Sequence, residues 1–286
     1  MKTPKRLQPL VDDGLIDEVI CRLMSGKEAD IFIVRCGEIR RCAKVYKEAT
    51  KRNFKKAATY REGRKVRSGR RARAMEKRSN YGRKQQEEIW QNAEVDAISK
   101  LAAAGVRVPE TFGCVEGVLL MELVTDDEGD VAPRLDDVLL DPEQALEDHA
   151  VMMHYIQLML CAGLIHGDLS EFNVLLDPYG PVIIDLPQAV DAAANNNAQA
   201  MFTRDVDNIT RYYAEFAPQI GETRYAEEMW SLYEEGELKP ETELTGLYVD
   251  SGENADVDGV LEEIKAVMQE EQERQERIKE AEEEDL

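Results

Sequence analysis

The sequence predicts an α+β fold of two lobes, in which an antiparallel sheet comes first and a mainly helical lobe follows. Strand-like alternation dominates residues 17–46, and two further strand patterns lie within 109–124. From residue 141 onward the patterns are helical, with one hairpin near 174–184. Because strands and helices are segregated along the chain, we do not expect a regular parallel sheet.

The first lobe is expected to begin with an antiparallel meander. Its three strands are Glu18 to Met24, Ala29 to Arg35, and Ile39 to Tyr46. Ser25-Gly26-Lys27-Glu28 connects the first two, and Cys36-Gly37 makes the second turn, where glycine tolerates tight backbone angles.

One helix and two more strands complete this lobe. Residues 85–104 carry apolar side chains at helical spacing, and Gly105 ends the helix as a C-terminal cap. The strands Pro109 to Phe112 and Val118 to Val124 follow.

The second lobe is expected to be mainly helical. Asp141-Pro142-Glu143 has the chemistry of a helix start, and an apolar helix follows over 146–162. After the hairpin near 174–184, helices are expected near 204–217 and 222–235.

These elements predict a division into three parts. Residues 1–121 form the first lobe, 122–235 the second, and 236–286 an acidic linker with a charged helical tail at 259–284. The tail is expected to be a solvated helix, with partner binding as the alternative.

The charge is distributed unevenly. Residues 47–84 contain 16 Lys and Arg and three acidic residues, a local net charge of +13 in a chain whose net charge is −22. This basic segment fits a solvated insertion, a site that binds RNA or ribosomal particles through phosphates, or a segment that docks on the acidic tail. Aromatic residues are sparse in it, so any RNA binding should be non-specific and salt-dependent.

A cytoplasmic location without membrane attachment is expected. The five cysteines show no paired spacing, which favours reduced thiols. No targeting segment is recognisable, and the longest apolar stretch, 151–165, is shorter than the roughly 20 residues that span a bilayer.

The clearest chemical pattern follows the apolar helix. Asp168 is followed five residues later by Asn173, and Asp185 ends the next apolar strand. Phosphoryl transfer from ATP needs one carboxylate to orient the nucleophile, and a carboxylate and a carboxamide to hold Mg²⁺ or Mn²⁺. We therefore predict Asp168 as the catalytic carboxylate, Asn173 and Asp185 as metal ligands, and His166 as a brace for the loop.

A lysine in the third strand fits the same chemistry. Lys44 is expected to contact the phosphates of ATP and to pair with a glutamate on the helix 85–104. Glu94 is the first choice for this partner, with Glu87 and Glu88 as rivals, and a solvated Glu94 is the alternative.

The adenine would bind at the segment joining the lobes. Met121, Glu122 and Val124 follow an apolar strand, and their backbone groups are expected to contact the base.

The chain resembles the RIO family of atypical protein kinases over about residues 12–235. The resemblance rests on Ser25 through Phe32, on His166 through Asn173, on Trp90 with Glu94, and on Arg204 through Ile209. It implies a truncated protein-kinase fold and a phosphate loop in which Ser25 and Lys27 contact ATP.

The resemblance also implies function. RIO kinases phosphorylate serine, including their own, and some are described as ATPases in maturation of the small ribosomal subunit. Pro187 and the run Asn195–Asn197 depart from the family pattern, and the chain is similar to a stand-alone, bacterial type of member. A serine protein kinase of unidentified protein substrate is therefore expected.

Two other functions stay open. One is an ATPase switch that rides on ribosomal particles. The other is a small-molecule kinase, because aminoglycoside and choline kinases share the spacing from His166 to Asn173.

Overall fold

The computed structural model describes residues 2–47 and 93–248. The chain divides into two compact units, Met1–Leu247 and Tyr248–Leu286. Outside the described residues lie most of the basic segment, the charged tail, and the beginning of the predicted helix 85–104 with Glu87, Glu88 and Trp90.

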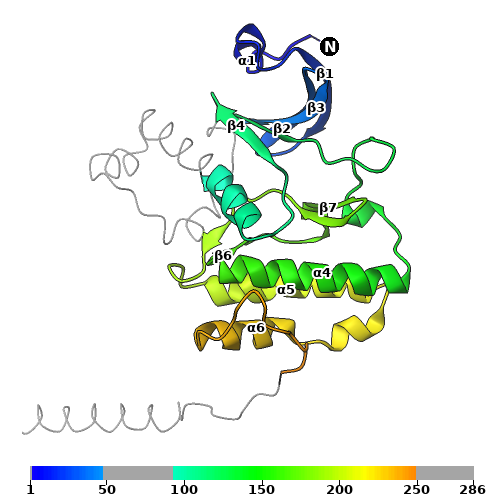
Figure 1. The fold of residues 1–286 in the computed structure, drawn as a ribbon, viewed down its shortest axis with the longest axis vertical. Helices are drawn as coiled ribbons and strands as arrows, with labels where there is room; N and C mark the ends of the chain where they lie inside the picture. Colours follow the sequence, from blue (N-terminus) through cyan, green and yellow to red (C-terminus); the bar gives the residue numbers. More distant parts are fainter. Residues whose placement is uncertain (1, 48–92, 249–286) are drawn as a thin grey trace, which may run out of the picture. The chain divides into compact units, whose positions relative to one another are not determined.

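In the described part of the chain, five strands form one antiparallel sheet with the order β1-β2-β3-β5-β4 (Figure 1). They are β1 (Glu18–Ser25), β2 (Ala29–Cys36), β3 (Ile39–Tyr46), β4 (Thr111–Val115) and β5 (Val118–Glu122). Each pairs antiparallel with its neighbours, which confirms the expected sheet lobe.

A short helix that the sequence analysis did not predict covers the outer side of the sheet lobe. α1 (Gln8–Asp12) has only five residues, too few for a helical period to show in the sequence. Leu7, Leu10 and Ile16 are buried with Val34 of β2 and Val118 of β5. The burial of these apolar side chains holds the N-terminal segment on the sheet.

The described part of the predicted helix 85–104 is helical over 93–103. Its apolar stripe, Ala97, Ile98 and Leu101, is buried in the same cluster as side chains of both lobes. Gly105 follows with φ of 90°, a conformation that favours glycine, so the expected cap is present. In Figure 1 this helix, coloured turquoise, lies between the sheet and the long helices below.

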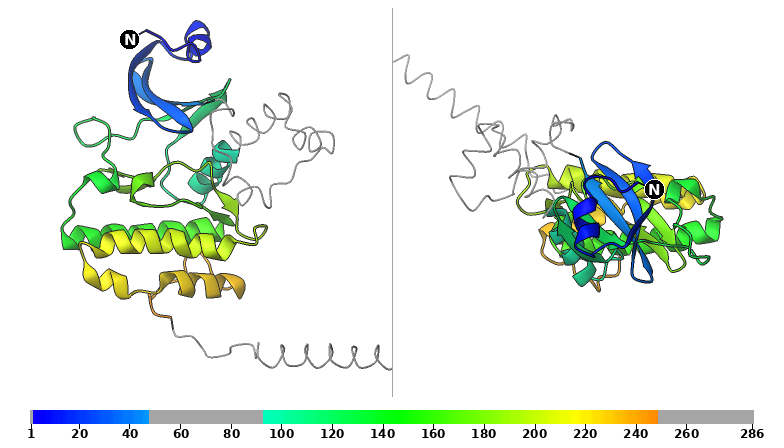
Figure 2. Two further views of the ribbon diagram at one scale, coloured as in Figure 1. Left: turned by 180° about the vertical axis from the view of Figure 1, so that it is seen from behind. Right: turned by 90° about the horizontal axis from the view of Figure 1, so that it is seen from above.

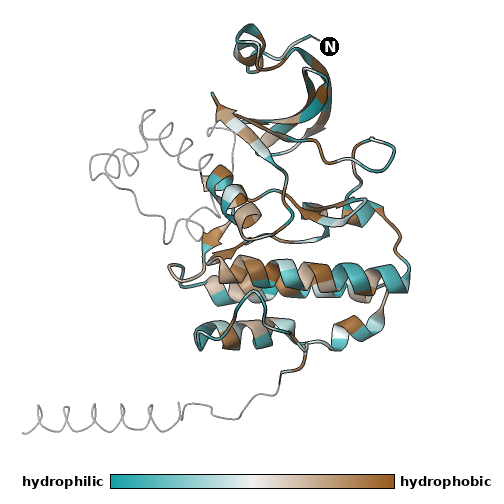
Figure 3. Ribbon diagram, in the orientation of Figure 1, coloured by the Kyte–Doolittle hydropathy of each residue, from teal (hydrophilic) through white to brown (hydrophobic). Residues whose placement is uncertain are grey.

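Three longer helices build the second lobe. α4 (Pro142–Cys161) combines the predicted start and the apolar helix in one element, and α5 (Ala198–Ala214) and α6 (Tyr225–Glu234) follow. The Asp141 carboxylate accepts the Gln144 N–H at 2.9 Å and caps α4. Figures 1 and 2 show α4 beside α5 with α6 below them, and Figure 3 shows how apolar residues continue along α4.

Two small strand pairs position the loops above these helices. β7 (Val174–Asp177) pairs with β8 (Gly180–Ile183), as expected. β6 (Leu164–Ile165) pairs with β9 (Val190–Asp191), a contact between distant segments that sequence patterns did not reveal. Together the pairs bracket the loops 166–173 and 184–189, so both loops emerge at one place.

The second lobe continues beyond the predicted boundary at residue 235. Residues up to Leu247 belong to the first compact unit. The Gln157 amide of α4 donates to the carbonyls of Lys239 and Thr242, and the Arg224 N–H donates to the Gly246 carbonyl. The first part of the expected linker is thus attached to the helical lobe, because its backbone carbonyls find donors there.

Candidate active site

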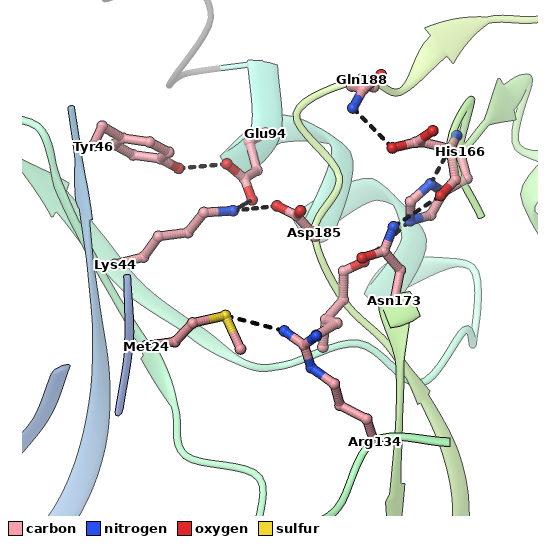
Figure 4. A network of polar contacts seen from close by, with 11 residues as sticks. Met24, Lys44, Tyr46, Glu94, Arg134, His166, Asn173, Asp185 and Gln188 are labelled. Carbon is pink, nitrogen blue, oxygen red and sulfur yellow. Dashed lines mark hydrogen bonds and ion pairs between the residues drawn. The ribbon is translucent and has the colours of Figure 1, made fainter. Parts of the chain in front are cut away.

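Lys44, Glu94 and Asp185 meet between the two lobes. The Lys44 ammonium lies 2.6 Å from Glu94 Oε1 and 2.6 Å from Asp185 Oδ1 (Figure 4). Lys44 and Glu94 are buried, whereas 47% of the Asp185 side chain is exposed. One ammonium therefore joins β3, the helix over 93–103 and the loop after β8.

Tyr46 completes this network. Its hydroxyl donates to Glu94 Oε2 at 2.5 Å, so both oxygens of that carboxylate are bonded. Burial and the negative charge of Glu94 raise the pKa of Tyr46. Burial alone would lower the pKa of Lys44, but the two carboxylates raise it. The lysine is therefore held as a buried cation between the two lobes.

Asp185 adopts a strained backbone conformation. Its φ is 66°, in the left-handed region that few residues other than glycine occupy. Burial opposes ionisation of its carboxyl, but the charge and hydrogen bond of Lys44 hold its pKa below the usual range. Such strain is often found at functional sites, where surrounding structure holds the residue in place.

His166 links the two bracketed loops. Its Nε2 lies 3.1 Å from the Ile184 carbonyl, and its Nδ1 lies 3.3 Å from the Asp168 N–H. A carbonyl can only accept and an N–H can only donate, so the tautomer with hydrogen on Nε2 makes both bonds. The buried imidazole braces the loop from behind, as the sequence analysis expected.

α5 also holds the loop 166–173, through Asp205, a residue for which the sequence predicted no individual role. The buried carboxylate of Asp205 accepts the N–H groups of Gly167 and Leu169 at 2.6 and 3.1 Å. Asn208 donates to the Leu169 carbonyl at 3.0 Å, and Arg204 donates to the Gly167 carbonyl. Burial raises the pKa of Asp205 to about 6 against the effect of these donors.

Asp168 is exposed and has one side-chain partner in the described residues. The amide of Gln188 donates to Asp168 Oδ2 at 3.0 Å (Figure 4). Gln188 lies three residues after Asp185 on the neighbouring loop, and no sequence pattern marks it as a site residue. Its hydrogen bond restricts the rotation of the carboxylate predicted to orient the nucleophile.

Asn173 has an orientation suited to a metal ligand. Its Nδ2 donates to the Asp168 carbonyl at 2.8 Å, so the amide nitrogen faces the loop backbone and the amide oxygen faces away from it. A carboxamide oxygen and the half-exposed carboxylate of Asp185 are hard donors that fit Mg²⁺ or Mn²⁺. Within residues 2–47 and 93–248, no group of three His, Cys, Asp or Glu forms a closed metal site. A cation bound through two protein ligands and nucleotide phosphates needs no such cage.

The expected phosphate loop is a hairpin between β1 and β2. The Ser25 hydroxyl donates to Asp30 Oδ1 at 2.5 Å, so here it serves the hairpin. Lys47 binds the Gly26 carbonyl at 2.5 Å and lies 3.3 Å from Asp30, a role not predicted. Lys27 is exposed at the tip. The structure thus shows a pinned loop, and contacts of Ser25 and Lys27 with ATP stay predictions.

The segment joining the lobes is held by an arginine. Arg107 binds Glu122 through both Nη atoms, at 2.9 and 2.7 Å, and Asp177 at the end of β7 through Nη2 at 2.9 Å. Met121 lies in β5, paired with β3, and the Val124 carbonyl accepts the Ala132 N–H at 3.0 Å. The Glu122 carboxylate is therefore structural here, and adenine binding by these backbone groups stays a prediction.

Comparison with known proteins gives one consistent result. Residues 30–226 match the family model of the RIO domain. The chain is 32% identical over 210 residues to a protein of Haloferax volcanii named RIO-type serine/threonine-protein kinase Rio1, covering 71% of this chain and 66% of the relative. It is 27% identical over 217 residues to the serine/threonine-protein kinase rio1 of Schizosaccharomyces pombe, covering 74% and 41%.

A third relative is the serine/threonine-protein kinase RIO3 of Caenorhabditis elegans, 33% identical over 132 residues, with 44% of this chain and 25% of the relative covered. The chain thus spans about two thirds or less of the length of these curated relatives. Within the described ranges, no helix has both the length and the apolar character needed to cross a bilayer.

Proposed function

Because the chain belongs to the RIO domain family, a truncated form of the protein-kinase fold, we propose that it transfers the γ-phosphate of ATP to serine in proteins. The observation that carries this proposal is the ammonium of Lys44, held 2.6 Å from both Glu94 and Asp185. That arrangement leaves a fixed cation and a half-exposed carboxylate beside the loop that bears Asp168.

Each residue has a defined task in this proposal. Lys44 neutralises charge on the ATP phosphates, and Glu94 holds its ammonium in place. Asn173 and Asp185 hold Mg²⁺ or Mn²⁺, and a bound divalent cation offsets negative charge on the phosphates. Asp168, restrained by Gln188, orients the serine hydroxyl and accepts its proton.

Most of the acceleration would come from positioning and charge, because phosphoryl transfer requires little covalent work from the protein. The loops 166–173 and 184–189 are tied together by the β6–β9 pair and by His166. They therefore present Asp168, Asn173 and Asp185 at fixed relative positions.

Two finer proposals extend this one. The protein substrate includes the chain itself, and the basic segment 47–84 brings the kinase to RNA or ribosomal particles. An ATPase cycle is the second candidate function. It is favoured by the exposure of Asp168, since a water molecule can reach that carboxylate as readily as a serine hydroxyl.

The test follows the γ-phosphate of labelled ATP in the full chain, counting phosphoserine and free phosphate separately, with and without ribosomal particles. Asp168→Asn and Asp185→Asn remove charge with little change of shape, and asparagine tolerates the positive φ at position 185. Asp127→Asn, on the exposed loop after β5, is the matched control.

Serine labelling by the wild type and the control, with a loss of about 100-fold or more in both site variants, would support the kinase. Release of phosphate without serine labelling, stimulated by ribosomal particles, would favour the ATPase. Labelling that survives in both site variants would refute the assignment of the site. Transfer to small alcohols or aminoglycosides faster than to protein would show a small-molecule kinase.

A further inference from the structure

Arg134 reaches from the helical lobe across the cleft. Its backbone is fixed there, because the Pro133 carbonyl accepts the Leu176 N–H of β7 at 3.0 Å and the Arg134 carbonyl accepts the Asp137 N–H at 3.0 Å. Its side chain ends on β1 of the other lobe, with Nη2 3.1 Å from Met24 Sδ (Figure 4). The backbone of Arg134 is thus anchored in the helical lobe, and its guanidinium contacts the sheet lobe.

The contact with Met24 is a poor one for this side chain. A guanidinium offers five N–H donors, and a thioether sulfur is a weak acceptor. Within residues 2–47 and 93–248, Arg134 makes no ion pair with a carboxylate. Anions that accept two parallel hydrogen bonds, such as carboxylate and phosphate, are the partners that the planar guanidinium binds best.

The position of the guanidinium indicates which anion it meets. Met24 directly precedes Ser25 and Gly26, the start of the hairpin expected to cover the phosphates. In Figure 4 Arg134 lies below Met24, on the same side of the network as Asn173. Arg134 therefore lies beside the segment at which the nucleotide phosphates are expected.

We infer that Arg134 binds the phosphate chain of the nucleotide from the helical lobe, in addition to Lys44 of the sheet lobe. This inference rests on the proposed function and adds a specificity residue to it. Phosphate oxygens replace the Met24 sulfur as acceptors, and the two lobes are then joined through the nucleotide. Arg134 therefore distinguishes phosphorylated nucleotides from nucleosides.

The test measures binding, which does not depend on catalysis. Full-length wild type, Arg134→Gln, Arg134→Lys and Met24→Leu are titrated with ATP, ADP and adenosine in the presence of Mg²⁺ at one fixed salt concentration. Arg134→Gln should weaken ATP binding by about tenfold or more and leave adenosine binding unchanged, because only the charged hydrogen bonds to phosphate are lost. The ATP affinity of Arg134→Lys should lie between those of the wild type and Arg134→Gln, because lysine keeps the charge but cannot bind with bidentate geometry.

Two controls separate this role from general effects. Met24→Leu removes the sulfur but keeps an apolar side chain, so ATP should bind at least as tightly as to the wild type. Arg35→Gln removes the same charge from an exposed ion pair with Glu18 on the sheet, and should change ATP affinity by less than about twofold. Melting curves without nucleotide verify that each variant is folded.

Three outcomes would overturn the inference. Equal loss of ATP and adenosine affinity in Arg134→Gln would indicate a structural role. Unchanged ATP affinity with a raised KM for the protein substrate would show that Arg134 binds an acidic group of the substrate. Unchanged affinity for every ligand would leave no binding role for Arg134. A wild type that binds no ATP at all would instead overturn the proposed function.

Discussion

At the scale of single residues, the cleft is organised by hydrogen bonds whose donors lie far away in the sequence. Asp168 is restrained by Gln188, and Glu94 receives bonds from Lys44 and Tyr46. Each bond fixes a rotamer that would otherwise be free, and positioning within a fraction of an ångström decides how often reactants are aligned.

Gln188→Ala should therefore lower kcat and leave the KM for ATP little changed. The variant removes the donor 3.0 Å from Asp168 Oδ2 and touches none of the residues predicted to bind ATP. We expect a decrease in kcat of about tenfold, measured by steady-state kinetics with saturating protein substrate. Gln219→Ala, at an exposed position in the helical lobe, is the control. An unchanged kcat, or a rise in KM alone, would contradict the positioning role.

At the scale of elements, α5 supports the loop 166–173, which carries Asp168 and Asn173. The buried carboxylate of Asp205 accepts two backbone N–H groups of that loop. It thereby satisfies two buried donors and fixes the loop on α5. Its neighbour Asn208 uses the same face of the helix to bind the Leu169 carbonyl. Because Asn208 lies about one helical turn after Asp205, it reaches the peptide group that follows the one bound by Asp205.

The raised pKa of Asp205 makes this contact sensitive to pH. Burial raises the pKa from 3.8 to about 6, so the fold favours the protonated form. That contribution to stability is fully present below pH 3.8 and is lost as the pH rises through about 6. The free energy of unfolding of the wild type relative to Asp205→Asn should fall across this window by roughly 2–3 kcal/mol. Denaturant titrations between pH 4 and 7 measure it, and parallel curves for the two proteins would contradict the assignment.

At the scale of the whole folded unit, Arg107 ties the joining segment to the second lobe. Its guanidinium binds Glu122 and Asp177, and its carbonyl accepts the Ile183 N–H of β8 at 2.9 Å. The angle between the lobes is therefore restrained at the point where adenine is expected to bind. Lys44 and Arg134 cross the cleft at other places, so the lobes are joined at several points.

Arg107→Ala should destabilise the protein by about 1–3 kcal/mol and raise the KM for ATP, because two partly buried carboxylates lose their cation. The stability and the KM for ATP of Arg107→Lys should lie between those of the wild type and Arg107→Ala, because lysine cannot bind Glu122 with two parallel hydrogen bonds. Arg35→Ala breaks an exposed pair instead and should cost less than about 1 kcal/mol. Denaturant unfolding and ATP kinetics test these values. Equal effects of Arg107→Ala and Arg35→Ala would show that burial of the Arg107 network contributes little.

The sequence by itself determined the sheet lobe and the long helices, and it predicted the residues of the candidate site. These features depend on local patterns: alternation in strands, helical spacing, and the separation of Asp168, Asn173 and Asp185 along the chain. The choice of Glu94 as the partner of Lys44 came from the same motif reasoning, and the structure brings the two together.

Only the tertiary structure decided the contacts of Gln188, Asp205, Arg107 and Arg134, and the pairing of β6 with β9. Each joins segments that are distant in sequence, where no local period or spacing marks the partner. The five-residue α1 and the attachment of residues 236–247 to the helical lobe were also hidden. Such short segments are held by burial and by hydrogen bonds to other elements, so their structure follows from the fold around them and not from their own propensity.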